Sequence, residues 1–322
     1  MKLLPSRDRP WVNLALLLLT LASTFLVYFT LFASGTGSSL ASRVPEALTF
    51  SVSLLLILGS HEMGHYVWAR KHGVQTSLPY FIPVPFGLGT MGAVIRLRSP
   101  IPTRNALVDI GASGPIAGIL VAICVLAVGF ARSHVESGSD AGFVLGGGDS
   151  LVGALRTLFH EAVARLNHHA LPSAAAGPEG LVLGDSLLML GLQRLFVGPV
   201  SAQSQIASGP LLLAGWFGVL VTMLNLLPIG QLDGGHVAFA VLGDRASLLG
   251  RAMAAVLLFL SLWVSWSWLL WFLLTTFVIG VRHPPVLHPL EPLTRRRKQI
   301  AILCAVLLVI CFMPLPTQLR GT

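Results

Sequence analysis

Long apolar runs separated by short polar segments dominate the hydrophobic pattern of this chain. Each run approaches the ~20 residues that a helix needs to cross the hydrocarbon core of a bilayer. The pattern predicts an all-α polytopic membrane protein with about six or seven transmembrane helices. The expected spans are residues 11–33, 47–70, 106–130, 209–229, 246–263, 265–281 and 299–315.

The fifth and sixth spans are the hardest to separate. Residues 252–281 form one continuous apolar block that is rich in tryptophan. The tryptophans suit an interfacial belt at a turn near Ser265, and they suit equally the lipid-facing side of one long tilted helix. The pattern therefore predicts either two spans or one in this block.

The composition also indicates a membrane protein and argues against a nucleic-acid partner. Hydrophobic residues make up 54% of the 322 residues and charged residues only 11%, whereas a soluble domain carries about 25% charged residues. The net charge of +8 comes from Lys and Arg residues that flank apolar spans. By the positive-inside rule, this distribution places the N-terminus in the cytosol. A bacterial cytoplasmic membrane is the expected location.

Residues 71–105 do not fit a helix. Prolines interrupt the stretch 78–86, and glycines follow it. Residues 93–98 then alternate in part and include β-branched residues, which is typical of a strand or hairpin. We expect a small membrane-associated β-hairpin here, with a plain connecting loop as the alternative.

Residues 131–208 form the only long hydrophilic stretch, rich in Gly, Ala and Ser. Weak helical patterns cover 150–167 and 181–197, and the strand signals are too few for a folded β domain. The sequence predicts an extracytoplasmic loop with short amphipathic helices.

The chemistry centres on the cluster His61-Glu62-Met63-Gly64-His65 within the second apolar span. Ionisable groups inside a membrane-length segment are costly and mark function by default. On a helix, positions i and i+4 share a face, so both imidazoles can reach one metal. The order His-Glu-x-x-His is that of a zinc hydrolase site, with Glu62 placed to act on water. This site is expected near the cytosolic end of its span.

A catalytic zinc needs a third protein ligand and an open position. Asp233 is the best candidate, because an apolar span runs into the segment 225–236 (NLLPIGQLDGGH), Pro228 ends or kinks it, and glycines free the backbone around the carboxylate. The alternative is a helix-ending turn in which the aspartate is a cap.

Together these two segments resemble the site-2 protease family of intramembrane zinc metalloproteases. Residues 225–236 are similar to that family's N-x-x-P-x-x-x-L-D-G pattern, and Gly114-Pro115 with Gly118 provides a supporting match. The resemblance covers roughly residues 47–130 and 209–245. It implies one Zn²⁺ per chain, held by His61, His65 and Asp233.

The same resemblance implies the other roles. Glu62 would be the general base on the zinc-bound water and would later protonate the leaving amine. Asn225 would lie near the site and hydrogen-bond the substrate or the oxyanion. The substrate would be another transmembrane protein, surrounded by membrane lipid.

Further residues are candidates for supporting roles. His236 is expected either to lie near the metal and support one of its ligands, or to be a hydrogen-bonded residue at a helix start. Asp109 is expected to cap its helix or to face the polar cavity. The edge of the hairpin is expected to pair with an unwound substrate through Val94, Ile95, Arg96 and Leu97.

The expected organisation has an N-terminal span and loop (1–46), a first catalytic part (47–130), an extracytoplasmic insertion (131–208), a second catalytic part (209–245) and C-terminal spans (246–322). The predicted function is intramembrane zinc endopeptidase activity. A metal-binding transporter and a catalytically inactive scaffold are the alternatives; neither explains why a complete set of catalytic residues is present. The sequence predicts no oligomeric state.

Overall fold

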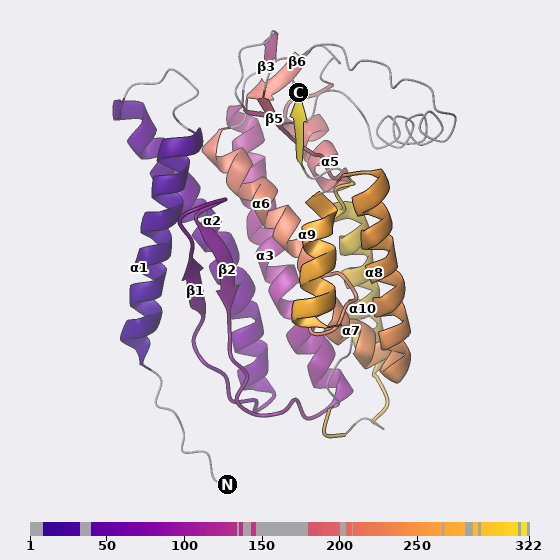
Figure 1. The fold of residues 1–322 in the computed structure, drawn as a ribbon. Coiled ribbons are helices and arrows are strands. Elements are labelled where there is room, and N and C mark those ends of the chain that lie inside the picture. The colour runs from indigo at the N-terminus through magenta and orange to yellow at the C-terminus, as the bar shows by residue number, and fades with distance from the viewer. Residues whose placement is uncertain are drawn as a thin grey trace, which may run out of the picture.

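In the computed structural model, apolar helices stand side by side and carry the chain repeatedly from one end of the molecule to the other (Figure 1). The structure describes residues 9–32, 40–133, 135–137, 143–145, 180–199, 204–207, 209–265, 267–280, 286–288, 291–314 and 317–320.

The described helices confirm a mostly helical polytopic membrane protein. Four segments are long and apolar enough to cross a membrane, namely Pro10–Phe32, Ala41–Lys71, Arg104–Arg132 and Asp233–Trp263. They contain α1 (Pro10–Val27), η1 (Tyr28–Phe32), α2 (Leu40–Lys71), α3 (Arg104–Arg132), α7 (Asp233–Leu242), η3 (Gly243–Arg245) and α8 (Ala246–Trp263). The expected count of six or seven spans is not confirmed, because other helices, such as α6 (Pro210–Asn225), are shorter.

The tryptophan-rich block contains two helices, but two spans are not confirmed, because Ser267–Ile279 is shorter than the helices long enough to cross a membrane. α8 ends at Trp263, and α9 (Ser267–Leu273) begins after a turn in which the Ser265 N–H donates to the Leu260 carbonyl at 2.9 Å. α9 continues as the π-helical turn η4 (Leu274–Ile279) and lies beside α8. The last helix is α10 (Arg295–Cys311).

The expected hairpin is present. Strand β1 (Tyr80–Pro83) pairs antiparallel with β2 (Thr90–Val94), with Tyr80 opposite Val94. Irregular pairing continues before the start of β1 and after the end of β2. The Ser77 N–H donates to the Arg96 carbonyl, and the Arg98 N–H donates to the Gln75 carbonyl. We call residues 75–98 the hairpin. The strand begins three residues earlier than the predicted 93–98.

The polar insertion differs from its prediction. A five-stranded sheet in the order β3-β6-β4-β5-β7 stands at one end of the helices (Figure 1). Its strands are β3 (Val135–Ser137), β4 (Phe143–Leu145), β5 (Gly180–Leu183), β6 (Ser204–Ala207) and β7 (Thr317–Arg320). A sheet was not expected, because strands of three or four residues leave almost no periodic signal. The helix predicted over 181–197 is present as α5 (Leu187–Phe196), and the one over 150–167 lies outside the described residues.

α3 is the centre of the helical assembly. It contacts α2, α6, α7 and α10, and it buries Leu107, Ala122 and Leu126 completely. Small residues let the helices approach closely, since a Cβ on Gly215 of α6 would meet the Leu126 side chain. Close approach at small residues is the usual way in which helices associate in membranes.

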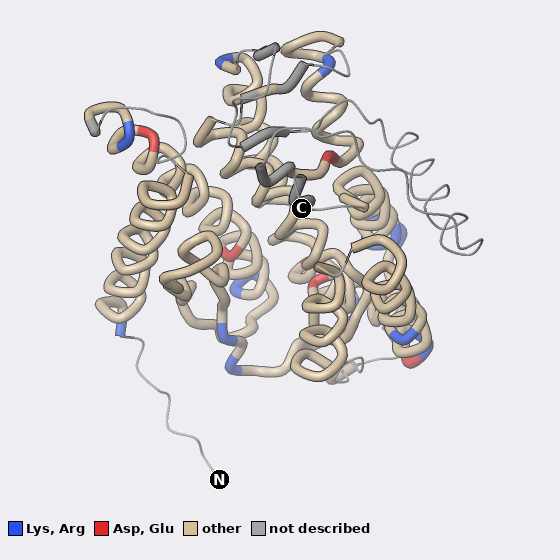
Figure 2. Tube along the Cα trace, turned by 45° about the horizontal axis from the view of Figure 1, so that its top comes forward, with Lys and Arg blue, Asp and Glu red and all other residues tan. Residues whose placement is uncertain are grey.

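Charged residues concentrate near the ends of the helices, while the middle portions are almost free of them (Figure 2). This distribution is that of helices whose central portions face lipid or one another. The few charges at depth are therefore the ones that need an explanation.

Candidate metal centre

Helix α2 places two imidazoles on the same face. His61 and His65 are one helical turn apart, both are buried, and their Nε2 atoms lie 3.2 Å from each other. His65 lies about six residues before the end of α2, which corresponds to about 9 Å along the helix axis. The pair is therefore inside the apolar layer but close to one end of the helices.

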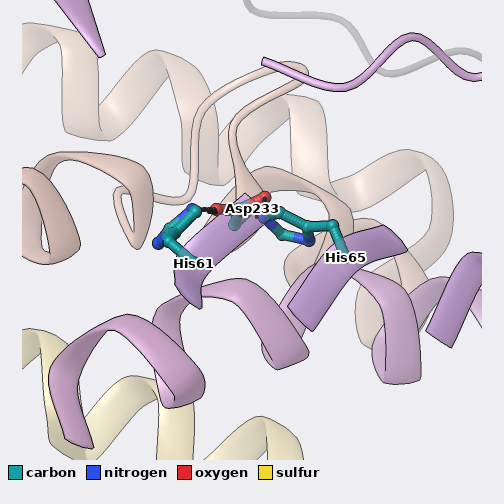
Figure 3. Close-up of side chains that lie close together, drawn as sticks. All are labelled: His61, His65 and Asp233. Carbon is teal, nitrogen blue, oxygen red and sulfur yellow. Dashed lines mark hydrogen bonds and ion pairs between the residues drawn. The ribbon is translucent and has the colours of Figure 1, made fainter. Parts of the chain in front are cut away.

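The third candidate ligand comes from the first residue of α7. The Asp233 Oδ2 atom is 3.2 Å from His61 Nε2, and the Oδ1 atom is 3.3 Å from His65 Nε2. Figure 3 shows the carboxylate between the two imidazoles, with the facing nitrogens turned toward it. In the described part of the chain, this trio is the group of His, Cys, Asp and Glu side chains whose ligand atoms converge as a metal site requires.

The distances within this trio fit a zinc ion. Zinc bound tetrahedrally at about 2.0–2.1 Å from each ligand atom leaves those atoms about 3.3 Å apart. The observed separations of 3.2 and 3.3 Å match that spacing. Two imidazoles and one carboxylate are also a donor set that catalytic zinc sites use.

A hydrogen bond fixes the orientation of the second imidazole. His65 Nδ1 lies 2.8 Å from the Ile110 carbonyl oxygen of α3. Because a carbonyl only accepts, Nδ1 must carry the proton and donate. The Nε2 lone pair then points toward Asp233 and is available to a metal, which is how metal-ligating histidines are normally held.

Glycines of α3 create the space that the candidate ligands occupy. A Cβ on Gly114 would collide with the His65 ring, and one on Gly118 would lie 3.2 Å from the His61 Cβ. A Cβ on Gly111 would lie 3.0 Å from the His236 Cβ and 3.2 Å from the Asp233 carbonyl oxygen. The Gly114 and Gly118 positions noted in the sequence thus form part of the wall behind the site.

Backbone packing holds Asp233 in place. We call residues 225–236 the ligand turn. A Cβ on Gly234 would meet the Leu226 carbonyl oxygen, and one on Gly235 would meet that of Gly230. Gly230 has φ +52° and lies against the Gly280 carbonyl at the end of η4. The turn can therefore be this compact only with glycine at these positions.

Glu62 and Asn225 lie beside the trio. Glu62 is buried and accepts a hydrogen bond from the Ile95 backbone N–H of the hairpin. Asn225 ends α6, and its Nδ2 atom is 3.2 Å from His61 Nε2. Both side chains line a cavity of about 240 Å³ together with the three candidate ligands.

Most of the residues predicted from the sequence meet around this cavity. Its lining includes His236 and, from the hairpin, Val94, Ile95 and Leu97. Arg96 is exposed and is not part of the lining, and its backbone carbonyl accepts from the Ser77 N–H of the other strand. The sequence reasoning did not single out the lining residues Ala93, Ile110, Gln231 and Leu232. Gln231 and Leu232 were within the quoted pattern around Asp233, while Ile110 had no signal.

Asp109 has neither of its two predicted roles. Thr103 is the N-cap of α3, since its side chain accepts from the Ala106 N–H. The Asp109 carboxylate is buried and is bonded to Arg297 and His72. Both partners are distant in sequence, so local pattern alone could not reveal them.

A His-Glu-x-x-His helix, an aspartate from a distant turn and an apolar helical setting define the class of membrane-embedded metalloproteases. Residues 49–265, more than half of the chain, match the model of peptidase family M50. The chain belongs to this family, the site-2 protease family of zinc metalloproteases.

Similar proteins are found in plants. Two from Arabidopsis thaliana, named probable zinc metalloprotease EGY1, chloroplastic, and probable zinc metalloprotease EGY2, chloroplastic, are 29% identical over 278 residues and 26% identical over 276. Each alignment covers 86% of this chain, but only 44% and 43% of the respective relative. A probable zinc metalloprotease EGY2, chloroplastic, from Oryza sativa subsp. indica is 30% identical over 205 residues, covering 64% of this chain and 31% of that protein.

The chain thus spans less than half the length of these curated relatives. No solved structure matches it. The apolar helices support an integral membrane protein. The expectation of a bacterial cytoplasmic membrane receives no support, because these relatives are chloroplastic.

Proposed function

We propose that this protein is a zinc endopeptidase that hydrolyses peptide bonds within or near transmembrane segments of other membrane proteins. The observation that carries the proposal is the convergence of His61, His65 and Asp233 at zinc-like spacing inside an apolar helical layer. One zinc ion per chain would be held by these three side chains. When bound, zinc supplies a Lewis acid that polarises the scissile carbonyl and lowers the pKa of water.

Glu62 is the proposed general base. Its carboxylate lies in the cavity next to His61, and the Ile95 N–H holds it in place. It would accept a proton from the attacking water at a carboxylate oxygen and then give that proton to the leaving amine. The amide of Asn225 faces the same space and would donate a hydrogen bond to the developing oxyanion.

The hairpin is the proposed binding edge for the substrate. Arg96 and Arg98 direct their backbone groups toward the opposite strand of the hairpin. Because backbone direction alternates along a strand, Ile95 and Leu97 direct theirs toward the cavity. An unwound substrate segment would pair with this open edge through the Ile95 carbonyl and the backbone groups of Leu97, since the Ile95 N–H already donates to Glu62, and it would be kept extended there.

The distribution of Lys and Arg supports an orientation of the protein in the membrane. We propose that the N-terminus and the metal centre face the side of the membrane on which Lys and Arg concentrate, the cytosolic or equivalent side. The basic residues at the start of α10 and the end of α2 lie at this end of the molecule.

The test is zinc content and cleavage of a model transmembrane substrate by purified protein in liposomes, for the unaltered chain and for Glu62→Gln. We expect one zinc per chain in both proteins and cleavage only by the unaltered one, because glutamine keeps the shape of Glu62 and loses the base. Loss of general base catalysis should reduce the rate at least about 10²-fold.

Two alternatives are distinguished when zinc uptake into the same liposomes is measured as well. A metal transporter would move zinc across the liposome membrane without cleaving the substrate. An inactive scaffold would bind zinc in both proteins and cleave with neither. Absence of zinc from both proteins would refute the assignment of the three ligands.

A further inference from the structure

The beginning of α3 is bonded to segments that are far apart in the sequence. Arg104 donates from Nε to the Ala240 carbonyl at 2.6 Å and from Nη2 to the Val241 carbonyl at 2.9 Å. These carbonyls belong to the last turn of α7, the helix that begins with Asp233. A cation at a helix C-terminus satisfies carbonyls that have no helical partner. Arg104 thus attaches the ligand-bearing α7 to α3.

The next residue, Asn105, and Asp109 about one turn further along α3 attach the start of α10. Asn105 donates from Nδ2 to the Pro292 carbonyl at 3.1 Å and accepts from the Thr294 N–H at 3.0 Å. Asp109 receives three contacts from Arg297: Nη2 to Oδ2 at 2.7 Å, and Nε to Oδ1 and Oδ2 at 3.1 and 3.2 Å. The guanidinium therefore grips the carboxylate through two of its nitrogens, which fixes direction as well as distance.

Asp109 also holds the end of α2. His72, just after the last residue of that helix, places its Nε2 atom 2.9 Å from Asp109 Oδ2. The next residue after Asp109 is Ile110, whose carbonyl accepts from His65 Nδ1 at 2.8 Å. Asp109 and Ile110 therefore contact α2 at two positions two helical turns apart on one face. Together these two contacts fix the position of α2 along its axis and its rotation about that axis, relative to α3.

We propose that Asp109 is a positioning residue for the metal centre. Its pair with Arg297 fixes α3 so that the Ile110 carbonyl meets His65 Nδ1 and the His65 Nε2 lone pair points at Asp233. The Asp109 side chain is only 3% exposed, so its charge is held in place by its partners and not by water. This inference rests on the proposed zinc site. It assigns to Asp109 the role of keeping the His65 imidazole in the tautomer and orientation that can bind zinc.

A purely structural ion pair is the competing explanation. Removal of such a pair would lower thermal stability and leave the affinity of the folded protein for zinc unchanged. A positioning role requires instead that zinc affinity and turnover change in protein that is still folded. Zinc affinity is therefore the decisive measurement, and thermal stability is recorded beside it.

The experiment uses the full chain in detergent, with zinc alone as the probe and a competing chelator to obtain its Kd. The first variant is Asp109→Asn, which keeps the shape of the side chain and removes its charge. The second is Arg297→Lys, which keeps the charge and removes the pair of guanidinium nitrogens that bind the carboxylate. Arg296→Gln is the control, since Arg296 is the exposed neighbour and makes no ion pair within the described residues. The kcat and KM for a model transmembrane substrate are measured at saturating zinc.

We expect the zinc Kd to rise 10- to 100-fold in Asp109→Asn, the range typical of groups that orient a metal ligand. Arg297→Lys should show a smaller rise in the same direction, kcat should fall with KM unchanged, and Arg296→Gln should match the unaltered protein. If Asp109→Asn does not fold, Arg297→Lys decides, because its partly exposed side chain permits a conservative change.

A lower Tm with a zinc Kd within twofold of the unaltered protein, in either variant, would overturn the positioning role. That result leaves the proposed function intact. If the unaltered chain itself fails to bind zinc, the proposed function fails and the inference fails with it, so the two failures are distinguishable.

Discussion

The ligand turn and the hairpin face the same cavity but differ in how closely other backbone packs around their glycines. In the ligand turn, a Cβ on Gly230, Gly234 or Gly235 would meet a carbonyl oxygen, so backbone packs directly on backbone. In the hairpin, Gly89 packs on the Thr24 backbone of α1, but Gly87 and Gly92 have no neighbouring atom within 4 Å of the Cβ position. A metal ligand needs one fixed position, whereas a substrate-binding edge needs backbone groups that are still available.

The largest effect is expected from breaking the packed region. Gly234→Ala would place a methyl group on the Leu226 carbonyl. Because the obstacle is backbone and cannot rotate away, we expect a loss of at least about 3 kcal/mol of stability and little bound zinc. Thermal unfolding and zinc analysis of the purified protein check this.

The control for that change is Gly87→Ala in the hairpin. Gly87 has φ +62° and open space around its Cβ position. The left-handed backbone alone should cost about 1–2 kcal/mol, with zinc content unchanged. Equal loss of zinc in the two variants would contradict the contrast between the two regions.

The next effect concerns the open edge. Leu97→Pro removes the backbone N–H that would pair with a substrate, and the residue before a proline favours the extended backbone already present there. Loss of about one net hydrogen bond, 0.5–1.5 kcal/mol, should slow cleavage several-fold to about tenfold, while zinc content stays normal.

Leu97→Val keeps the N–H and is the matched variant. It should cleave at a rate close to that of the unaltered protein. Normal cleavage by Leu97→Pro would mean that substrates do not pair with this edge.

The smallest effect is expected where α1 supports the hairpin. Asn13 donates from Nδ2 to the Pro79 carbonyl at 2.8 Å and to the Leu78 carbonyl at 3.2 Å. Hydrogen bonds between membrane segments average about 0.6 kcal/mol, so Asn13→Leu should slow cleavage only about threefold and leave zinc content unchanged. Leu14→Ala, at the exposed neighbouring position, should have no effect. A similar slowing in both variants would show that α1 acts through general packing.

Local patterns predicted the elements that depend on neighbours in sequence. The apolar runs located α1, α2, α3 and α6, because a helix in the hydrocarbon core of a bilayer must be apolar over most of its length whatever the fold. Proline and glycine spacing located the hairpin. The five-stranded sheet was missed because its pairs are long-range, as β5 with β7 is, and each strand is too short to show alternation.

The candidate site divides in the same way. The i, i+4 spacing of His61 and His65 determines on its own that they share a helix face. The residues around Asp233 made it the best candidate for a third ligand, and the resemblance implied that role. Sequence could not show that Asp109 meets Arg297 and His72, or that the Ile110 carbonyl orients His65.

By itself, the sequence determined which side chains are chemically able to bind a metal and which segments are apolar enough to lie in a membrane. Both follow from residue type and from spacing within one helix. Only the tertiary structure decided the distances between ligands on different helices, the tautomer of His65 and the open side of the hairpin. These depend on how α2, α3 and α7 pack, and packing is set by contacts between residues that are far apart along the chain.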